Sequence, residues 1–229
     1  PSMSEYHKVD PSRAAKIPAE VEEYQYWISE PVACAVNNIR WARVEPGDTV
    51  VLIGCGYMGL LNLQGLPINI TERTIAVDVA EVPLKLAKRF GADLTLNASQ
   101  ADIVEEISEL TKGRGADIVI EASGAPGTLE MATKITRPGG RLCIFGFHVG
   151  EEKVPTGVWH MKSLEVLNTA PSISRNFIKD MQDATKLMIK GTFDQRPLIT
   201  HSFPYTEAQK AFEVALQHPE GYIKGAILF

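Results

Sequence analysis

The chain has 229 residues, 45% of them hydrophobic, and a formal net charge of −5 from 23 basic and 28 acidic side chains. This acidic balance, without any basic run, argues against nucleic acid or an anionic membrane as a partner, and no apolar segment reaches the roughly 18 residues of a membrane span. Cys34, Cys55 and Cys143 lie far apart, which is typical of free thiols in a cytoplasmic protein.

A helix is expected before the first strand. Pro31 suits the first turn of a helix, and Val32, Cys34–Val36 and Ile39 give it an apolar side. The turn Glu45-Pro46-Gly47-Asp48 then leads into a strand.

From residue 49 to about 168, strand-like and helix-like segments alternate. The expected strands are Thr49–Ile53, Thr74–Asp78, Leu94–Leu96, Asp117–Glu121, Arg141–Phe145 and Leu164–Leu167, with helix-like stretches at 57–66, 81–89, 99–111, 126–136 and 157–162. Pro67 should end the first of these helices after about Gln64, and Pro138-Gly139-Gly140 should form a turn into the fifth strand. This alternation predicts an α/β fold with a Rossmann-type, doubly wound, six-stranded parallel sheet.

After residue 176 the pattern changes. A helix (Phe177–Lys190), a strand (Pro197–Phe203), a helix (Thr206–Gln217) and a last strand (Ile223–Phe229) are expected. These elements indicate a second, smaller unit.

The first strand runs into a dinucleotide-binding fingerprint, G-x-G-x-x-G. Its residues Gly54, Gly56, Tyr57, Met58 and Gly59 are expected to bind a pyrophosphate. The glycines permit the tight turn, the close approach of the phosphates and the packing of the next helix, whose N-terminus favours negative charge.

Asp78 ends the second strand, 19 positions after the last glycine. A carboxylate at this place can bind both hydroxyls of an adenosine ribose and would repel a 2′-phosphate. The nearest cation along the following chain is Lys85, in the next helix, so NAD is expected in preference to NADP. An N-cap for that helix is the alternative role, and both roles can coexist.

Further motifs are spread over nearly the whole chain. They are Glu5–Val9 with Ala15–Pro18, Glu30-Pro31, Val44–Val50, Leu86–Asp93, Gly115–Asp117, Glu121–Gly124, Arg137–Gly140, Leu198–Phe203, Ala211–Glu213 and Lys224-Gly225. With the fingerprint, they resemble the medium-chain dehydrogenase/reductase family, of the zinc-dependent alcohol and polyol type near sorbitol and threonine dehydrogenases.

The resemblance implies a division of the chain into three parts. Residues 1–29 would be a remnant of a GroES-like catalytic domain, 30–175 the NAD-binding Rossmann domain, and 176–229 a segment returning to the catalytic domain. Most of that catalytic domain, with its zinc ligands, has no counterpart in this sequence, so zinc is expected in full-length members but not in this chain. By resemblance only, Glu30 would stand near such a metal; a carboxylate favoured by the helix dipole is the alternative.

The resemblance also extends the cofactor site beyond the fingerprint. Ser123 and Gly124 follow the fourth strand, and Phe145, Gly146 and Phe147 follow the fifth. They would line the site, and the second group would present backbone atoms to the nicotinamide; a plain strand end with its turn is the alternative for that group. Asn168–Ala170 resemble the segment that closes over the nicotinamide. His201 is expected to be structural.

These observations favour the NAD-binding portion of an alcohol, polyol or sugar dehydrogenase that transfers hydride between a secondary alcohol and nicotinamide. It is expected to be inactive alone, to have no catalytic residue of its own, and to form a homodimer through the sheet edge at Leu164–Leu167. The alternative is a non-catalytic NAD-binding or sensor module that works with another chain. A methyltransferase shares the glycine loop, but the elements after residue 176 argue against it.

Overall fold

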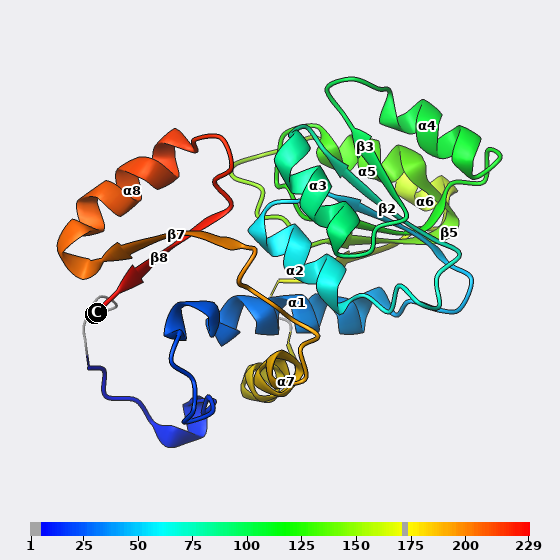
Figure 1. Cartoon of the computed structure of the whole chain (residues 1–229). Helices are drawn as coiled ribbons and strands as arrows, with labels where there is room; N and C mark the ends of the chain where they lie inside the picture. Colours follow the sequence, from blue (N-terminus) through cyan, green and yellow to red (C-terminus); the bar gives the residue numbers. More distant parts are fainter. Residues whose placement is uncertain (1–5, 171–173) are drawn as a thin grey trace. The chain divides into compact units, whose positions relative to one another are not determined.

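The structure is a computed structural model that describes residues 6–170 and 174–229. The chain divides into two compact units (Figure 1). One unit consists of Ala35–Ser174, and the other joins the residues up to Cys34 to Arg175–Phe229. The division falls inside the first α-helix, α1 (Ser29–Ala42), so the three-part organisation expected from the sequence stays a prediction.

The unit Ala35–Ser174 is built on a six-stranded sheet in the order β3-β2-β1-β4-β5-β6. Every neighbouring pair is parallel. The strands are β1 (Thr49–Ile53), β2 (Arg73–Asp78), β3 (Leu94–Asn97), β4 (Ala116–Glu121), β5 (Thr136–Ile144) and β6 (Glu165–Asn168). The predicted doubly wound parallel sheet is therefore confirmed.

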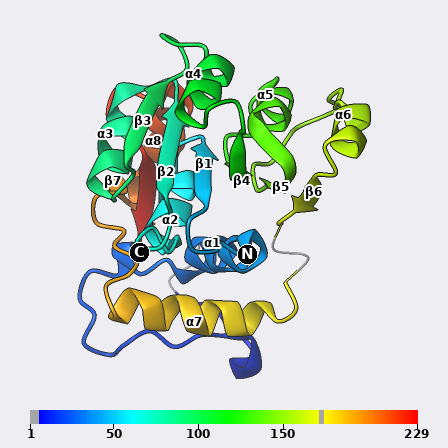
Figure 2. The same cartoon turned by 90° about the vertical axis from the view of Figure 1, so that its right-hand side faces the viewer.

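Helices cover both faces of this sheet, as Figures 1 and 2 show. They are α2 (Tyr57–Gly65), α3 (Glu81–Arg89), α4 (Ile103–Leu110), α5 (Thr128–Ile135) and α6 (Thr156–Met161). Side chains of α4 and α5 pack with alternate residues of the central strands in one apolar core. Because both faces are covered, every residue of β1 and β4 is buried, which explains their near-continuous apolar sequences.

Two boundaries differ from the sequence expectation. Pro138-Gly139-Gly140 is not a turn before the fifth strand, because β5 begins at Thr136, directly after α5, and these residues form an irregularity within it. Gly139 has a φ of 67° there. The helix expected over 99–111 starts only at Ile103, because the Asp102 carboxylate accepts hydrogen bonds from Val104 N and Glu105 N and so caps it.

The other unit contains a small parallel sheet of β7 (Ile199–Pro204) and β8 (Lys224–Leu228), connected by α8 (Ala208–Gln217). It also contains α7 (Phe177–Ile189) and short 3-10 turns at Pro11–Arg13, Tyr24–Tyr26 and Tyr205–Glu207. The buried amide of Gln195 joins its two chain segments by donating to Tyr26 O at 3.1 Å and Ile28 O at 3.0 Å.

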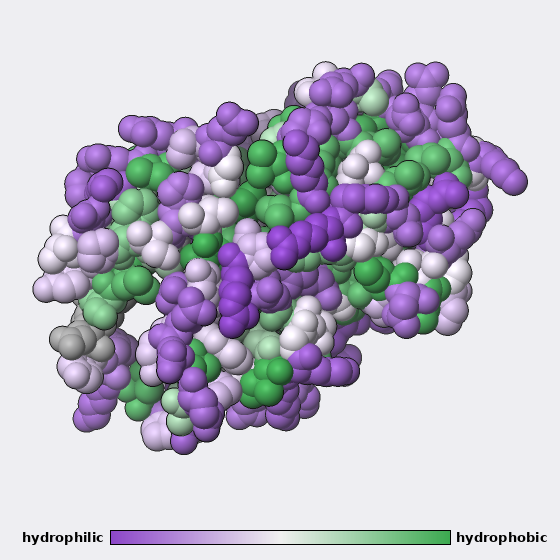
Figure 3. All heavy atoms as spheres, in the orientation of Figure 1, coloured by the Kyte–Doolittle hydropathy of each residue, from purple (hydrophilic) through white to green (hydrophobic). Residues whose placement is uncertain are grey.

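The surface drawn in Figure 3 mixes hydrophilic and hydrophobic residues, as is normal for a folded domain. No helix within the described ranges has the length and apolar character needed to cross a lipid bilayer.

Candidate cofactor site

The carboxyl ends of β1 and β4 lie side by side at the centre of the sheet. β1 pairs with β2 on one side and with β4 on the other, so the strand order reverses between β1 and β4. In open α/β sheets, ligands bind outside the carboxyl ends of the strands at such a switch point. The predicted fingerprint follows β1 at this edge, and the predicted ribose-binding acid ends the neighbouring strand β2.

The fingerprint forms a turn that has no room for larger residues at two of its glycines. Gly54 has a φ of 90°, and a Cβ atom on it would lie 2.7 Å from Ser123 N. A Cβ atom on Gly59 would lie 1.9 Å from Gly54 O. Gly54 therefore allows the turn to contact the loop after β4, and Gly59 lets α2 start close to the strand.

The third glycine faces open space. Gly56 is exposed and is the N-cap of α2, with no side chain capping the first turn. Nothing lies within 4 Å of the position that its Cβ atom would take. Tyr57 is buried and Met58 half-buried. The start of α2 thus offers backbone N–H groups beside an unobstructed Gly56, an arrangement suited to phosphate oxygens.

Asp78 is linked to the fingerprint turn by its carboxylate. Its Oδ2 accepts from Cys55 N at 2.6 Å, and its Oδ1 accepts from Ala80 N at 2.9 Å. The N-cap of α3 is Ala80, without a side-chain cap, so the alternative role of Asp78 as N-cap is wrong. Asp78 instead sits half-exposed at the end of β2, and each of its oxygens has a further lone pair for a ligand hydroxyl.

Cys55 lies inside the fingerprint but is not available for chemistry. Its side chain is fully buried, and its Sγ lies 3.6 Å from Val77 O. Burial raises the pKa of the Cys55 thiol above its ordinary range, and the nearby Asp78 carboxylate raises it further. The thiol therefore stays protonated and unreactive.

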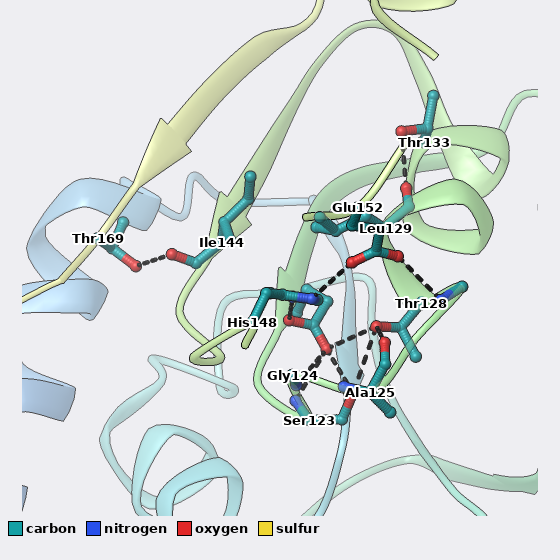
Figure 4. A network of polar contacts seen from close by, with 12 residues as sticks. Ser123, Gly124, Ala125, Thr128, Leu129, Thr133, Ile144, His148, Glu152 and Thr169 are labelled. Atoms are coloured by element: carbon teal, nitrogen blue, oxygen red, sulfur yellow. Dashed lines mark hydrogen bonds and ion pairs between the residues drawn. The ribbon is translucent and has the colours of Figure 1, made fainter. Parts of the chain in front are cut away.

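The second half of the sheet ends in a buried carboxylate that the sequence analysis missed. Glu121, the last residue of β4, is 0% exposed. Its Oε1 accepts from Ser123 N at 2.9 Å, Gly124 N at 3.0 Å and Thr128 Oγ1 at 3.0 Å, and also from the Ser123 hydroxyl at 2.5 Å. Glu121 therefore holds the turn after β4 through Ser123, Gly124 and Thr128, which are labelled in Figure 4.

His148 extends this network toward the loop after β5 (Figure 4). Its Nε2 lies 2.8 Å from the free oxygen of Glu121, Oε2, and its Nδ1 lies 2.8 Å from Glu152 Oε2. Glu152 Oε1 in turn accepts from Gly127 N at 2.9 Å. The histidines look isolated in sequence, but the fold places this one between two carboxylates.

The backbones of the two turns are in direct contact. Phe145 N and Gly146 N both donate to Glu121 O at 2.8 Å. A Cβ atom on Gly146 would lie 2.5 Å from Gly124 N, and one on Gly124 would lie 2.6 Å from Phe147 O. The Phe147 ring is 86% exposed. The structure thus brings together the residues predicted after β4 and β5, while their binding role stays a prediction.

The segment after β6 is also held by backbone contacts. Asn37 of α1 donates its side-chain amide to Thr169 O at 3.1 Å and Ala170 O at 3.4 Å. Thr169 N donates to Ile144 O at 2.9 Å. Asn37 is buried, and it was not singled out from sequence.

Glu30, the one residue with a metal role by resemblance, is exposed in the first turn of α1. Its carboxylate accepts from Cys34 Sγ at 3.4 Å. Burial raises the pKa of Cys34 to about 12, and the nearby Glu30 raises it further. Over residues 6–170 and 174–229, no three His, Cys, Asp or Glu side chains gather in a way that would hold a metal ion. The described residues do not fit a zinc site.

His201 makes ring contacts instead of facing a carboxylate. Its ring centroid lies 5.1 Å from that of Tyr222, and its Nδ1 lies 2.9 Å from Thr200 Oγ1. These contacts fit the structural role expected for it.

The sequence does contain a signal for the buried carboxylate of Glu121. Glu121 ends a strand that is apolar from Ile118 to Ile120, and it is followed by Ser123, Gly124 and Thr128, which supply short-range donors. A carboxylate in that position needs partners because burial of an unpaired charge is costly. No comparable signal connects His148 or Glu152 to it, since that contact depends on how the loop after β5 folds back.

Comparisons with known proteins agree with this architecture. The family model described as "Zinc-binding dehydrogenase" matches residues 53–190, more than half of the chain. The erythritol/L-threitol dehydrogenase of Mycolicibacterium smegmatis is 31% identical over 223 residues, which are 96% of this chain and 58% of that protein. The L-threonine 3-dehydrogenase of Bacillus subtilis is 30% identical over 212 residues, 93% of this chain and 60% of that protein.

Among solved structures, the short chain alcohol dehydrogenase rspB of E. coli CFT073, complexed with the cofactor NADH, superposes with a TM-score of 0.84. It is 26% identical, and the match covers 96% of this chain and 64% of that chain. This chain therefore spans about three fifths of the length of the curated relatives it matches. The family expected from the sequence motifs is confirmed, and the protein belongs to the zinc-binding dehydrogenases.

Proposed function

We propose that the unit Ala35–Ser174 binds NAD, as the cofactor-binding portion of an alcohol, polyol or sugar dehydrogenase. The observation that carries this proposal is the fingerprint turn itself, with an open N-cap glycine at α2 and a carboxylate 2.6 Å from the same turn. The NADH complex of the 26% identical relative supports it. When bound, NAD would supply a hydride acceptor for oxidation of a secondary alcohol.

The residues of this chain would hold the two halves of NAD differently. The start of α2 at Gly56–Gly59 would bind the pyrophosphate through backbone N–H groups. Asp78 would bind the adenosine ribose hydroxyls and disfavour a 2′-phosphate. Ser123, Gly124 and Phe145–Phe147 would line the nicotinamide half, with the segment Asn168–Ala170 beside it.

A direct test compares two glycines that have the same open space around the Cβ position, one inside the fingerprint and one outside it. Gly56 and Gly157 both lack a neighbour within 4 Å of the Cβ position, and neither has a positive φ. Gly56→Ala should weaken NADH binding, measured by fluorescence titration, because the added methyl group occupies the expected phosphate position. Gly157→Ala, in α6, should leave the affinity unchanged. Equal effects of the two variants, or no NADH binding by the wild type, would contradict the proposal.

The second candidate function is a non-catalytic NAD-binding or sensor module that works with another chain. The absence of a metal-holding group among the described residues favours it. In the first function, residues up to 29 and from 176 would be segments of a catalytic domain. Because all three cysteines are free and buried, a cytoplasmic location belongs to either proposal.

A further inference from the structure

We infer that Glu121, His148 and Glu152 form a positioning chain, which sets the turns after β4 and β5 in the arrangement that receives the nicotinamide half of NAD. This inference rests on the proposed NAD-binding function and adds three positioning residues to it. None of the three is expected to touch the reacting atoms. Their role is to hold the backbone that does the binding.

The location of the chain points to one half of the cofactor. A doubly wound sheet of this strand order consists of two mononucleotide-binding halves. Asp78 ends a strand of the first half, β1-β2-β3, whereas Glu121 ends the first strand of the second half, β4-β5-β6. Changes in the Glu121–His148–Glu152 chain should therefore affect the nicotinamide half and spare the adenosine half.

The hydrogen bonds form a closed circuit (Figure 4). Glu121 Oε1 holds Gly124 N at 3.0 Å, and Oε2 contacts His148 at 2.8 Å. His148 contacts Glu152 at 2.8 Å, and Glu152 returns to Gly127 N, in the turn where the circuit began, at 2.9 Å. The loop after β5 is thereby tied at two points to the turn after β4.

The backbone contacts transmit any displacement. Gly124 and Gly146 lie against the opposite turn with no room for a Cβ atom, and Ser123 lies against Gly54 of the fingerprint in the same way. If the loop after β5 lost its contact with Glu121, the turn after β4 would thus be displaced where the nicotinamide half is expected to bind. Closely packed turns of this kind have little compressibility, so a displacement of one turn is passed on to the other.

The number of donors and acceptors in the Glu121–His148–Glu152 contacts suggests a conservative variant. Carboxylates only accept hydrogen bonds, so both imidazole nitrogens must donate, or one carboxyl group must carry a proton. In Glu152→Gln, the new amide can donate to His148 Nδ1 while its oxygen keeps Gly127 N, and His148 Nε2–H still donates to Glu121. This variant should preserve the circuit with a neutral imidazole, whereas Glu152→Ala removes it.

The test compares NADH with ADP-ribose, which lacks the nicotinamide ring. In His148→Leu and Glu152→Ala, the dissociation constant for NADH should rise by about tenfold, the size expected for a lost charge-assisted hydrogen bond. The constant for ADP-ribose should change by less than about twofold on the same scale. In both variants, the fluorescence emission maximum of bound NADH should lie closer to that of free NADH than it does in the wild type.

Two variants serve as controls. Glu152→Gln should behave like wild type for both ligands. Glu151→Ala, at the exposed neighbouring position, should do the same. Thermal unfolding of Glu152→Ala, whose side chain is only partly buried, checks that the fold persists.

The outcomes are separable. Selective loss of NADH affinity, rescued in Glu152→Gln, supports the positioning role. Parallel loss of NADH and ADP-ribose binding, or unchanged NADH binding in His148→Leu, overturns this inference while the proposed function stands. Wild-type protein that binds neither ligand overturns the proposed function and the inference with it.

Discussion

At the scale of single residues, we expect Asp78 to determine the choice between NAD and NADP. Its two oxygens accept backbone hydrogen bonds from Cys55 and Ala80, which fix the carboxylate at the end of β2. The same carboxylate would meet the 2′-phosphate of NADP as a like charge. Like charges brought together at a binding site cost several kcal/mol.

We therefore expect NADH to bind at least about tenfold more tightly than NADPH. Asp78→Ala should narrow this gap, chiefly by losing NADH affinity. Fluorescence titration with both cofactors measures it. Asp102→Ala is the matched control, since that carboxylate caps α4 and its loss should cost about 1 kcal/mol of stability without changing the NADH preference. Tighter binding of NADPH by the wild type would refute the assignment.

At the scale of elements, a single buried carboxylate connects the starts of three strands. Asp117 of β4 accepts from Thr49 N of β1 at 2.8 Å and from Arg137 Nε of β5 at 2.5 Å. Arg114 contacts both of its oxygens, at 2.6 and 2.8 Å. Burial raises the pKa of Asp117, but the hydrogen bonds from Arg114, Thr49 and Arg137 outweigh it and bring the pKa down to about 2.

This depressed pKa predicts a pH-dependent contribution to stability. The stabilisation is complete above the ordinary carboxyl pKa of 3.8 and is lost as the pH falls through about 2. Asp117→Asn should lower the free energy of unfolding at pH 7 by roughly 1–2 kcal/mol, allowing for solvent screening at its rim. Urea titrations from pH 7 downward should show the difference from wild type shrinking below about pH 4.

The exposed pair Glu130–Lys134 on α5 provides the control for this measurement. Their side chains are more than half exposed and 2.8 Å apart, so Glu130→Gln should leave stability nearly unchanged. A constant difference between Asp117→Asn and wild type across the pH range would contradict the assigned role of Asp117.

At the scale of the whole molecule, the first expectation concerns activity. The described residues hold no group of three metal ligands, and the chain spans about three fifths of its curated relatives. Purified protein supplied with NAD and zinc should therefore not oxidise sorbitol, threonine or simple alcohols, as followed by NADH absorbance. Chelator-sensitive turnover would prove this wrong.

The second whole-molecule expectation is a homodimer through β6. In the sheet of the described residues, β6 pairs only with β5, and an exposed edge strand favours pairing with another copy. Nearby Met161 is 82% exposed, whereas the Trp159 indole donates to Thr133 Oγ1 at 2.7 Å. Met161→Glu therefore tests the interface with less risk to the fold than a change at Trp159.

Light scattering at micromolar concentration should show a dimer that Met161→Glu weakens. Leu216→Glu, at an 86% exposed position of α8, should leave the mass unchanged. A monomeric mass at all concentrations would contradict the expected dimer through β6.

The sequence by itself determined the fold class, the main strands and helices of the sheet domain, and the family. Apolar runs such as β1 and β4 alternate with helical segments. Two fingerprint glycines have local reasons to be glycine, because Gly54 has a φ of 90° and a Cβ atom on Gly59 would meet Gly54 O. Local signals of this kind depend on neighbours in the chain, so they can be read without coordinates. They were weaker at boundaries, where Asp102 capped α4 later than expected and the Pro138–Gly140 segment stayed inside β5.

Only the tertiary structure decided which distant side chains meet. Glu121 and His148 are 27 positions apart, and nothing in their neighbourhoods indicates a shared hydrogen bond. The contact exists because parallel pairing aligns the ends of β4 and β5. Gly124 and Gly146 then allow the two turns to approach each other closely. Periodicity and motifs report on local backbone preference, whereas a buried polar circuit depends on the geometry that packing imposes on separate segments.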